Sequence, residues 1–317
     1  MNRPTFLRRS TALLLTLVLM ICAALPGFAA YQMPIQTASD TESVYLFNLD
    51  TGKPILRQNS DQQRYIASLT KMMTALLFLE SGKDMNAEIT IPTSLTQEFK
   101  DIQNANGSTM NLRIGETVRR IDMMYAMLLP SANDAASVLA VDTSGSLAAF
   151  AAQMNVRAGQ LGCTATHFPC PHGLYDGGNY STARDMAKIA AAAFANKTLC
   201  EIDSTLSYKF PATKAAAART ITPGHKMLYP NDSRYYAGIV GGKTGYTSKA
   251  GNTLVTCVEK NGVRMVAVIL KSKSTHYEDT KKMLDYGYQY VNTEKSGSTS
   301  AGKQTTAGHW VQDNGRG

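Results

Sequence analysis

The alternation of hydrophobic and polar residues predicts a β-hairpin followed by a helix in the first third of the chain. Strand-like runs at 44–48 and 55–58 flank Asp50-Thr51-Gly52-Lys53, which is a turn signal. Across residues 68–80 the apolar side chains instead recur at helical spacing, and Gly82 falls where a C-terminal cap belongs. We therefore expect a strand pair that leads directly into an amphipathic helix.

Helical patterns dominate the middle of the chain. Residues 121–129 and 133–141 predict two helices, and Pro130 marks the break between them. Farther along, Thr182-Ala183-Arg184-Asp185 has the pattern of a capping box, and it opens a helix that is expected to continue to residue 194. No internal repeat interrupts this region.

The last third of the chain returns to strands. Runs at 253–259 and 263–270 flank Asn261-Gly262, which is a strong hairpin signal. A closing amphipathic helix is predicted over residues 279–291. From residue 292 to 317 Ser, Thr, Gly and Lys dominate, so we predict a disordered tail.

The order of these elements is hairpin, long helical middle, hairpin and helix. This order predicts an α+β fold, in which an antiparallel sheet packs against helices and a mainly helical insertion forms the other wall of a cleft.

The N-terminus has the pattern of a secretory signal peptide over residues 1–29. An apolar run at 12–25 is followed by small residues, with cleavage expected after Ala29. Basic residues precede the run: Arg3, Arg8 and Arg9. An uncleaved membrane anchor is the alternative, although the run is shorter than the ~20 residues that span a bilayer comfortably. We therefore predict an exported protein whose catalytic domain covers residues 30–291.

Charge and cysteine content refine this picture. The net charge of +8 favours anionic polymers or surfaces, or reflects only a solvated basic surface. No stretch combines clustered basic residues with aromatic ones, which argues against nucleic acid as a partner. Four cysteines remain after the leader, and they allow three pairings: Cys163, Cys170, Cys200 and Cys257. Export favours disulfides, with Cys163 and Cys170 as the pair that a short loop would bring together. A zinc site that also uses His167 and His172 is a further possibility.

Three short motifs carry the candidate chemistry: Ser68-Leu69-Thr70-Lys71, Ser131-Ala132-Asn133 and Lys243-Thr244-Gly245. The first places a nucleophile and a lysine three residues apart, so that both lie on one side of a helix. S-x-x-K alone is weak evidence, and Ser300-Ala301-Gly302-Lys303 in the predicted tail also matches it. All three motifs in this order indicate a serine acyl-transfer site that lacks a histidine base. A Ser-His-Asp hydrolase is disfavoured because the chain has no G-x-S-x-G elbow.

With these motifs the chain resembles the serine D-Ala-D-Ala carboxypeptidases among the low-molecular-mass penicillin-binding proteins, peptidase family S11. The resemblance runs from about residue 44 to residue 290 and includes Pro171-His172-Gly173-Leu174. Four positions depart from the family pattern: Ile66, Cys170, Gly242 and His276. His276 falls near the position of a carboxylate-binding arginine, so this change bears on substrate preference.

The resemblance implies a β-lactamase/transpeptidase-like fold, with a five-stranded antiparallel sheet flanked by helices. It implies a Ser68 acyl-enzyme, with Lys71 as the base that needs a lowered pKa. It also implies that Ser131 relays a proton and that Asn133 orients Lys71. Lys243 and Thr244 would hold a terminal carboxylate, and Gly245 and Tyr246 would complete the substrate-binding strand. The Tyr246 and Ser68 amides would form the oxyanion hole.

The implied substrate is the peptidoglycan pentapeptide stem, with β-lactams as covalent inhibitors and with no metal or cofactor. After cleavage of the leader no stable membrane anchor is expected, and the oligomeric state stays open. An endopeptidase that cuts cross-links is the main alternative. A β-lactamase is disfavoured by Ala132, where class A enzymes carry aspartate, and by the lack of an E-x-x-L-N segment. A catalytically silent wall-binding protein is a third possibility.

Overall fold

The computed structural model describes residues 32–175, 177–213 and 216–304, with side chains described as far as residue 294. The chain divides into Met1–Pro34 and Ile35–Gly317, and every element named below belongs to the second unit. The predicted signal peptide lies outside the described residues.

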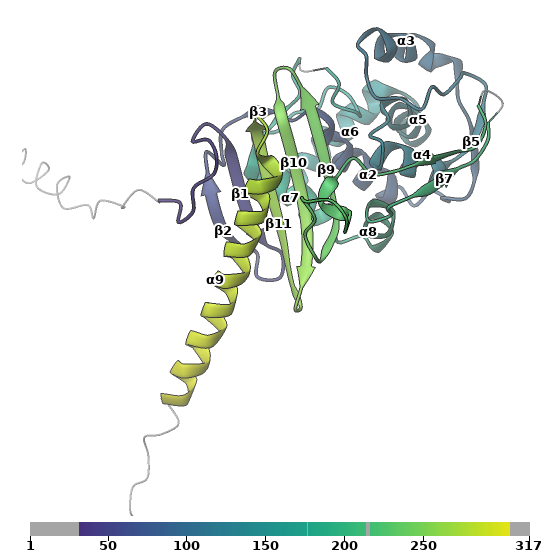
Figure 1. Ribbon diagram of the computed structural model, residues 1–317. Coiled ribbons are helices and arrows are strands. Elements are labelled where there is room, and N and C mark those ends of the chain that lie inside the picture. Colours follow the sequence, from purple (N-terminus) through teal and green to yellow (C-terminus); the bar gives the residue numbers. More distant parts are fainter. Residues whose placement is uncertain (1–31, 176, 214–215, 305–317) are drawn as a thin grey trace, which may run out of the picture. The chain divides into compact units, whose positions relative to one another are not determined.

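A five-stranded antiparallel sheet forms one half of this unit, with the strand order β2-β1-β11-β10-β9 (Figure 1). The strands are β1 (Ser43–Asn48), β2 (Lys53–Gln58), β9 (Ile239–Thr247), β10 (Gly251–Lys260) and β11 (Val263–Ser272). Both predicted hairpins are therefore confirmed, and so is the antiparallel sheet. Strand β9, which carries the third motif, lies at an edge of the sheet and faces the helical half.

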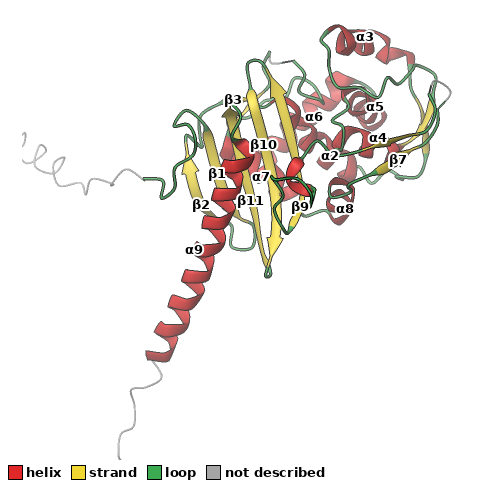
Figure 2. Ribbon diagram, viewed as in Figure 1, coloured by secondary structure: helices red, strands yellow, loops and turns green. Residues whose placement is uncertain are grey.

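Helices form the second half and cover the sheet, as Figure 2 shows. They are α2 (Thr70–Glu80), α3 (Thr96–Asn104), α4 (Arg120–Leu128), α5 (Asn133–Ser144), α6 (Leu147–Gln160), α7 (Ala183–Ala193), α8 (Lys197–Asp203) and α9 (His276–Gln304). Helices α7 and α9 pack against the sheet. The predicted helix start is confirmed with Thr182 as the N-cap, because its hydroxyl accepts a hydrogen bond from the Asp185 amide at the start of α7. The reciprocal bond of a capping box is not among those of the described residues, since the Asp185 carboxylate accepts from the Ala165 amide instead.

Short elements complete the fold. Three two-stranded pairs join β3 (Arg64–Tyr65) to β6 (Tyr180–Ser181), β4 (Glu88–Thr90) to β5 (Thr117–Arg119), and β7 (Tyr208–Phe210) to β8 (Arg219–Ile221). Three 3-10 turns are η1 (Ala67–Leu69), η2 (Thr93–Leu95) and η3 (Lys226–Leu228).

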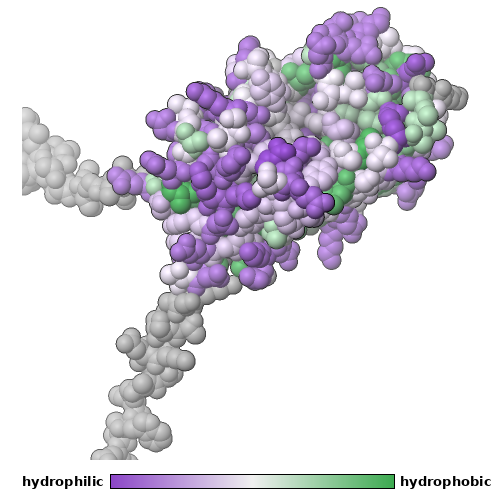
Figure 3. Space-filling model, in the orientation of Figure 1, coloured by the Kyte–Doolittle hydropathy of each residue, from purple (hydrophilic) through white to green (hydrophobic). Residues whose placement is uncertain are grey.

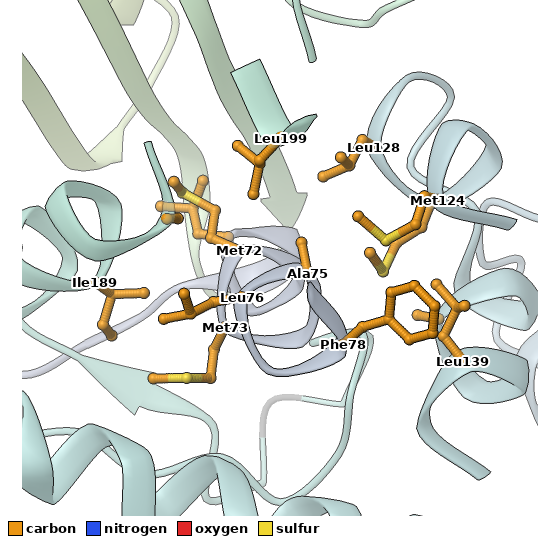
Figure 4. Close-up of a cluster of buried hydrophobic side chains, with 14 of the residues drawn as sticks. Met72, Met73, Ala75, Leu76, Phe78, Met124, Leu128, Leu139, Ile189 and Leu199 are labelled. Atoms are coloured by element: carbon orange, nitrogen blue, oxygen red, sulfur yellow. The ribbon is translucent and has the colours of Figure 1, made fainter. Parts of the chain in front are cut away.

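Helix α2 lies at the centre of the hydrophobic core, where it contacts α4, α5, α6 and α7 (Figure 4). Its buried side chains include Met72, Met73 and Phe78, none more than 2% exposed. The expectation of an amphipathic helix is wrong here, because α2 is buried on nearly every side, with Thr70, Lys71 and Thr74 among its buried residues. It is therefore held by packing from all directions. The residues at its N-terminus are thereby fixed relative to both halves of the fold.

Hydrophilic side chains cover much of the face seen in Figure 3.

The closing helix is longer than the sequence pattern predicts. Helix α9 begins at His276 and ends at Gln304, so the prediction of disorder from residue 292 is wrong for residues 292–304. Val291 is still buried, whereas residues 292–294 are exposed. The helix therefore continues beyond its contacts with the core. Residues 305–317 of the predicted tail lie outside the described residues. Among the described helices none is long and apolar enough by itself to span a membrane, and the bent pair α5 and α6 passes that test only jointly.

The expectation of disulfides is not met in the described chain, where Cys163, Cys170, Cys200 and Cys257 are all free. The Cys163 thiol faces the Asp185 carbonyl at 3.5 Å, whereas the Cys170 thiol faces the His172 ring. The two side chains thus have different neighbours, although their loop is short. Nor do three or more possible metal-ligating side chains come together anywhere in the described residues, which removes the basis for the zinc hypothesis.

Candidate active site

Ser68 lies on η1, two residues before α2 begins at Thr70. The preceding residue, Ala67, has a left-handed backbone (φ 49°), which turns the chain sharply into the helix. Two hydroxyls hold this turn from the side: Thr70 Oγ1 donates to the Ala67 carbonyl over 2.9 Å, and Thr253 Oγ1 on β10 donates to the Ile66 carbonyl over 3.1 Å. The nucleophile candidate is therefore fixed to both the helix and the sheet.

Lys71 is fully buried and has three acceptors around its side-chain nitrogen. Nζ lies 2.9 Å from Ser68 Oγ, 2.6 Å from Asn133 Oδ1 and 2.8 Å from the His172 carbonyl oxygen. An amide oxygen and a carbonyl oxygen can only accept hydrogen bonds, whereas a hydroxyl can also donate. A neutral amine fits this arrangement, with two N–H groups donated to Asn133 and His172 and the lone pair facing the Ser68 hydroxyl.

The electrostatic surroundings of Lys71 favour that neutral form. Burial lowers the pKa of the Lys71 side chain well below its ordinary value, and the positive charge of Lys243 lowers it further. A free lysine needs a depression of roughly three units, about 4 kcal/mol, to act as a neutral base near pH 7. The direction of the shift is thus the one that a general base at this position requires.

The second motif enters the site from the break between α4 and α5. Ser131 has a left-handed backbone (φ 64°), and its hydroxyl oxygen is buried without a hydrogen-bond partner among the described residues. Asn133 begins α5, and its backbone amide donates to the Ser108 carbonyl over 2.8 Å. The buried carboxylate of Asp134 accepts bonds from the Met110 and Leu112 amides, which ties a neighbouring loop to the same helix start.

The third motif lies on β9, and its lysine is balanced by a carboxylate that the sequence reasoning missed. Lys243 is 2% exposed, and burial lowers its pKa while the nearby Asp203 opposes this effect. Asp203, at the end of α8, is also buried and accepts a 2.6 Å hydrogen bond from the Gly242 amide. Burial raises the pKa of the Asp203 carboxyl, while the Gly242 amide and Lys243 lower it. An aspartate at the end of a helix carries no motif that could have pointed to this role.

Gly245 explains why β9 can approach the nucleophile so closely. A Cβ atom at this position would lie 2.9 Å from the Ser68 amide nitrogen and 2.5 Å from Thr253 Oγ1. Only glycine lets the strand pass this near to η1. Tyr246, the next residue, is 66% exposed. The Ser68 amide and residues 245–246 of β9 therefore lie side by side on one wall of a cleft.

These residues line a cleft of about 490 Å³ between the sheet and the helical half. Six of the eight predicted site residues line it: Ser68, Ser131, Asn133, Thr244, Gly245 and Tyr246. Lys71 and Lys243 lie buried behind its wall. His276 also lines the cleft, and its Nδ1 atom is buried without a partner among the described residues. The loop Asn106-Gly107-Ser108 lines the cleft as well, and the sequence reasoning missed it although Asn-Gly is a turn signal.

The His172 ring is held by partners on both sides. His172 Nδ1 lies 3.0 Å from the donating Leu174 amide, so Nδ1 is an acceptor and the proton is on Nε2. That nitrogen lies 2.7 Å from Glu98 Oε1. The neighbouring Cys170 thiol lies 3.7 Å from Nδ1. Burial lowers the pKa of His172, whereas Cys170 and Glu98 raise it, with a net rise. A proton on Nδ1 would face the donating Leu174 amide, so the hydrogen bonds are those of a neutral imidazole.

The departure at Gly242 also has a structural explanation. A Cβ atom there would lie 2.3 Å from the Val255 carbonyl oxygen and 2.7 Å from His225 Nε2. The His225 ring thus occupies the space beside this residue, and it pairs with Thr256 Oγ1 at 2.9 Å. Burial, together with the charge of Lys243, lowers the pKa of His225 to about 3, so the ring is neutral at physiological pH.

The chain is similar in sequence to a family of known enzymes. Residues 30–274 match the family model of the D-alanyl-D-alanine carboxypeptidases, peptidase S11. A D-alanyl-D-alanine carboxypeptidase of Streptomyces sp. strain K15 is 31% identical, covering 89% of this chain and 99% of that protein. The carboxypeptidase DacF of Bacillus subtilis is also 31% identical, and the match covers 81% of this chain but 64% of that longer protein.

Two further comparisons concern activity and structure. A D-alanyl-D-alanine endopeptidase of Pseudomonas aeruginosa is 30% identical over 79% of this chain and 78% of that protein. The crystal structure of the Streptomyces K15 DD-transpeptidase superposes with a TM-score of 0.72 at 29% identity, covering 82% of this chain and all of that one. The expected fold, with its five-stranded antiparallel sheet, is thereby confirmed. The chain belongs to the peptidase S11 family of serine-type D-alanyl-D-alanine carboxypeptidases.

Proposed function

We propose that this carboxypeptidase removes the terminal D-alanine from peptidoglycan pentapeptide stems through an acyl-enzyme on Ser68. The observation that carries the proposal is the 2.9 Å contact between Lys71 Nζ and Ser68 Oγ, made by a lysine with no exposure to solvent. A buried lysine that is poised to be neutral can accept the proton that a serine hydroxyl must lose before it attacks.

In the first step Ser68 Oγ forms a bond to the carbonyl carbon of the penultimate residue, and Lys71 takes the hydroxyl proton. The amides of Ser68 and Tyr246 stabilise the oxyanion, and the N-terminus of α2 adds a favourable dipole. When the carbon–nitrogen bond breaks, the leaving amine needs a proton. Ser131 is suited to pass that proton on, because its hydroxyl lies in the cleft with no competing partner among the described residues.

The terminal carboxylate of the substrate is held by charge and hydrogen bonding. Lys243 supplies the charge from behind the wall, and Thr244 supplies a hydroxyl in the cleft. His276 adds a neutral ring to the lining of the same cleft, because burial lowers its pKa. A site with one buried cation suits a substrate that ends in a single free carboxylate.

Water then attacks the ester on Ser68, and Lys71 is the base for this step as well. The products are a stem peptide shortened by one residue and free D-alanine, and the Ser68 hydroxyl regains its proton. A β-lactam follows the same first step, so we expect a covalent complex on Ser68.

We also propose that the protein acts outside the cytoplasm, on the cell wall. The residues that support this, 1–29, have the composition of a leader peptide that would be cleaved on export. The substrate class is consistent with such a location.

The decisive test is incubation with a pentapeptide that ends in D-Ala-D-Ala, with release of D-alanine as the measure. Wild-type protein is expected to release it, and Ser68→Ala to lose both release and labelling by a fluorescent penicillin. A cross-linked dimeric stem peptide in the same assay separates the endopeptidase alternative. Rapid turnover of a chromogenic penicillin would instead favour a β-lactamase, and release by Ser68→Ala would overturn the proposal.

A further inference from the structure

A second hollow, of about 340 Å³, has no part in the proposed mechanism. Its charged and aromatic lining comes from Arg64, Tyr65, Tyr180, Lys249 and Lys271. Two of the segments that form it also lead into the active site. Strand β3, with Tyr65, ends three residues before Ser68, and the turn with Lys249 follows directly on β9. The hollow therefore adjoins the cleft through both segments.

The three cations of this hollow have no acidic partner. Among the described residues, none of the ion pairs includes Arg64, Lys249 or Lys271. The Arg64 guanidinium instead donates to neutral groups, to Ser43 Oγ over 3.0 Å and to the Thr41 carbonyl over 3.1 Å. Lys249 Nζ lies 5.9 Å from the centre of the Tyr65 ring. The hollow is thus a cationic concavity in which no carboxylate competes for the charges.

The elements around the hollow hold these side chains in place. Strand β3 pairs with β6, which sets Tyr65 opposite Tyr180. Lys271 has a left-handed backbone (φ 63°), where the pairing of β11 with β10 shifts register. Such a bulge re-aims a side chain out of the regular alternation of a strand. Two of the three cations, Arg64 and Lys271, therefore extend from paired strands.

We propose that this hollow is a subsite for a carboxylate on the acyl-donor side of an acidic peptide substrate, whose D-Ala-D-Ala end lies in the cleft. The inference rests on the proposed function, because it concerns the part of that substrate farther from the cleaved bond. Lysine and arginine bind carboxylates through charge-assisted hydrogen bonds, and tyrosine rings cover the aliphatic part of a side chain. The subsite adds selectivity for acidic stems without contacting the reacting atoms.

The test uses two synthetic pentapeptides with the same D-Ala-D-Ala end, one with a free glutamate carboxylate and one with that group amidated. Wild-type protein is expected to cleave the acidic peptide with a kcat/KM about fivefold higher, the size that two exposed ion pairs supply. Lys249→Gln combined with Lys271→Gln removes two of the three cations, so it should abolish most of this preference and leave cleavage of the amidated peptide unchanged. The control combines Lys53→Gln with Lys209→Gln, which removes two exposed charges outside the hollow and retains the preference.

A binding measurement separates this inference from the proposed function. Ser68→Ala cannot turn the peptides over, so calorimetry on that variant compares their affinities directly. Tighter binding of the acidic peptide, lost in the Lys249→Gln and Lys271→Gln background and weakened by salt, supports the subsite. Equal affinities in Ser68→Ala, or a preference that survives undiminished in this background, overturn it. If neither peptide is cleaved by wild-type protein, the proposed function fails whatever the calorimetry shows.

Discussion

The side-chain nitrogen of Lys71 lies 2.8 Å from the backbone carbonyl oxygen of His172, a residue 101 positions farther along the chain. This contact uses a main-chain atom of His172, so it could not be predicted from a motif of side chains. Together with the Asn133 side-chain oxygen it fills two of the three positions around the nitrogen and leaves the third to Ser68. The geometry of the nucleophile pair therefore depends on how the loop that carries His172 is held.

The pH profile of the reaction is the first prediction. Because Lys71 must be neutral to accept a proton, kcat/KM should rise with pH as this lysine loses its proton. Burial lowers the pKa of Lys71, which places this rise below the ordinary lysine value of about 10.4. The pKa of Lys243 is lowered too, and it must stay charged, so the rate should fall again at higher pH. A profile that rises steadily to pH 10 would contradict these assignments.

The second prediction concerns the carboxylate beside Lys243. Asp203→Asn keeps an oxygen for the Gly242 amide but removes a negative charge that raises the pKa of Lys243. The alkaline side of the kcat/KM profile should therefore move to lower pH, by about one unit. Glu201→Gln, which removes a charge from the exposed side of the same helix, is the matched control. An unchanged alkaline limb in Asp203→Asn would show that Asp203 does not raise the pKa of Lys243.

The third prediction tests whether Glu98 positions His172. Glu98→Ala leaves the buried Nε2–H of His172 without its acceptor, which should cost about 1–3 kcal/mol of unfolding free energy. Because the His172 carbonyl faces Lys71, kcat/KM should also fall, by about tenfold. Glu98→Gln keeps an acceptor oxygen and should restore most of the unfolding free energy and most of kcat/KM. Equal defects in the two variants would mean that the charge of Glu98, rather than its hydrogen bond, is what matters.

The fourth prediction concerns the space beside Gly242. Gly242→Ala would place a carbon 2.3 Å from a backbone oxygen on β10 and 2.6 Å from the His225 ring, so β9 must shift. We expect a loss of about 1–3 kcal/mol in urea unfolding, as in other overpacked cores. Gly159→Ala, inside α6 with nothing within 4 Å of the added carbon, should instead be stabilising, by up to about 1 kcal/mol. Similar effects of the two substitutions would show that the close approach at Gly242 costs nothing.

The fifth prediction concerns redox conditions. Because the four cysteines of the described chain are unpaired, a reductant should leave the melting temperature unchanged. A structural disulfide would behave differently, since its loss typically costs about 2–5 kcal/mol. A clear drop in melting temperature on reduction would therefore show that two of these thiols do pair in the protein.

Features that depend on neighbours in the chain could be predicted from the sequence. The hairpins β1–β2 and β10–β11 follow from alternation and a turn signal, and helix α2 follows from its apolar spacing. The predicted helix start at residue 68 is two residues early, because Ser68 lies on η1. Helical geometry alone places Ser68 and Lys71 on one side, because residues three apart meet across a turn. The length of α9 could not be predicted in this way, because composition indicates whether a segment can pack but not where an unpacked helix ends.

The sequence by itself determined the order of the three motifs and the functional groups that their residues carry. Only the tertiary structure decided what surrounds the two lysines: the His172 carbonyl beside Lys71, and Asp203 and His225 beside Lys243. It also decided that the cysteines stay apart and that β9 lies against the turn at Ser68. The physical reason is that burial and charge set the pKa of a lysine, and both come from residues that are distant in the chain.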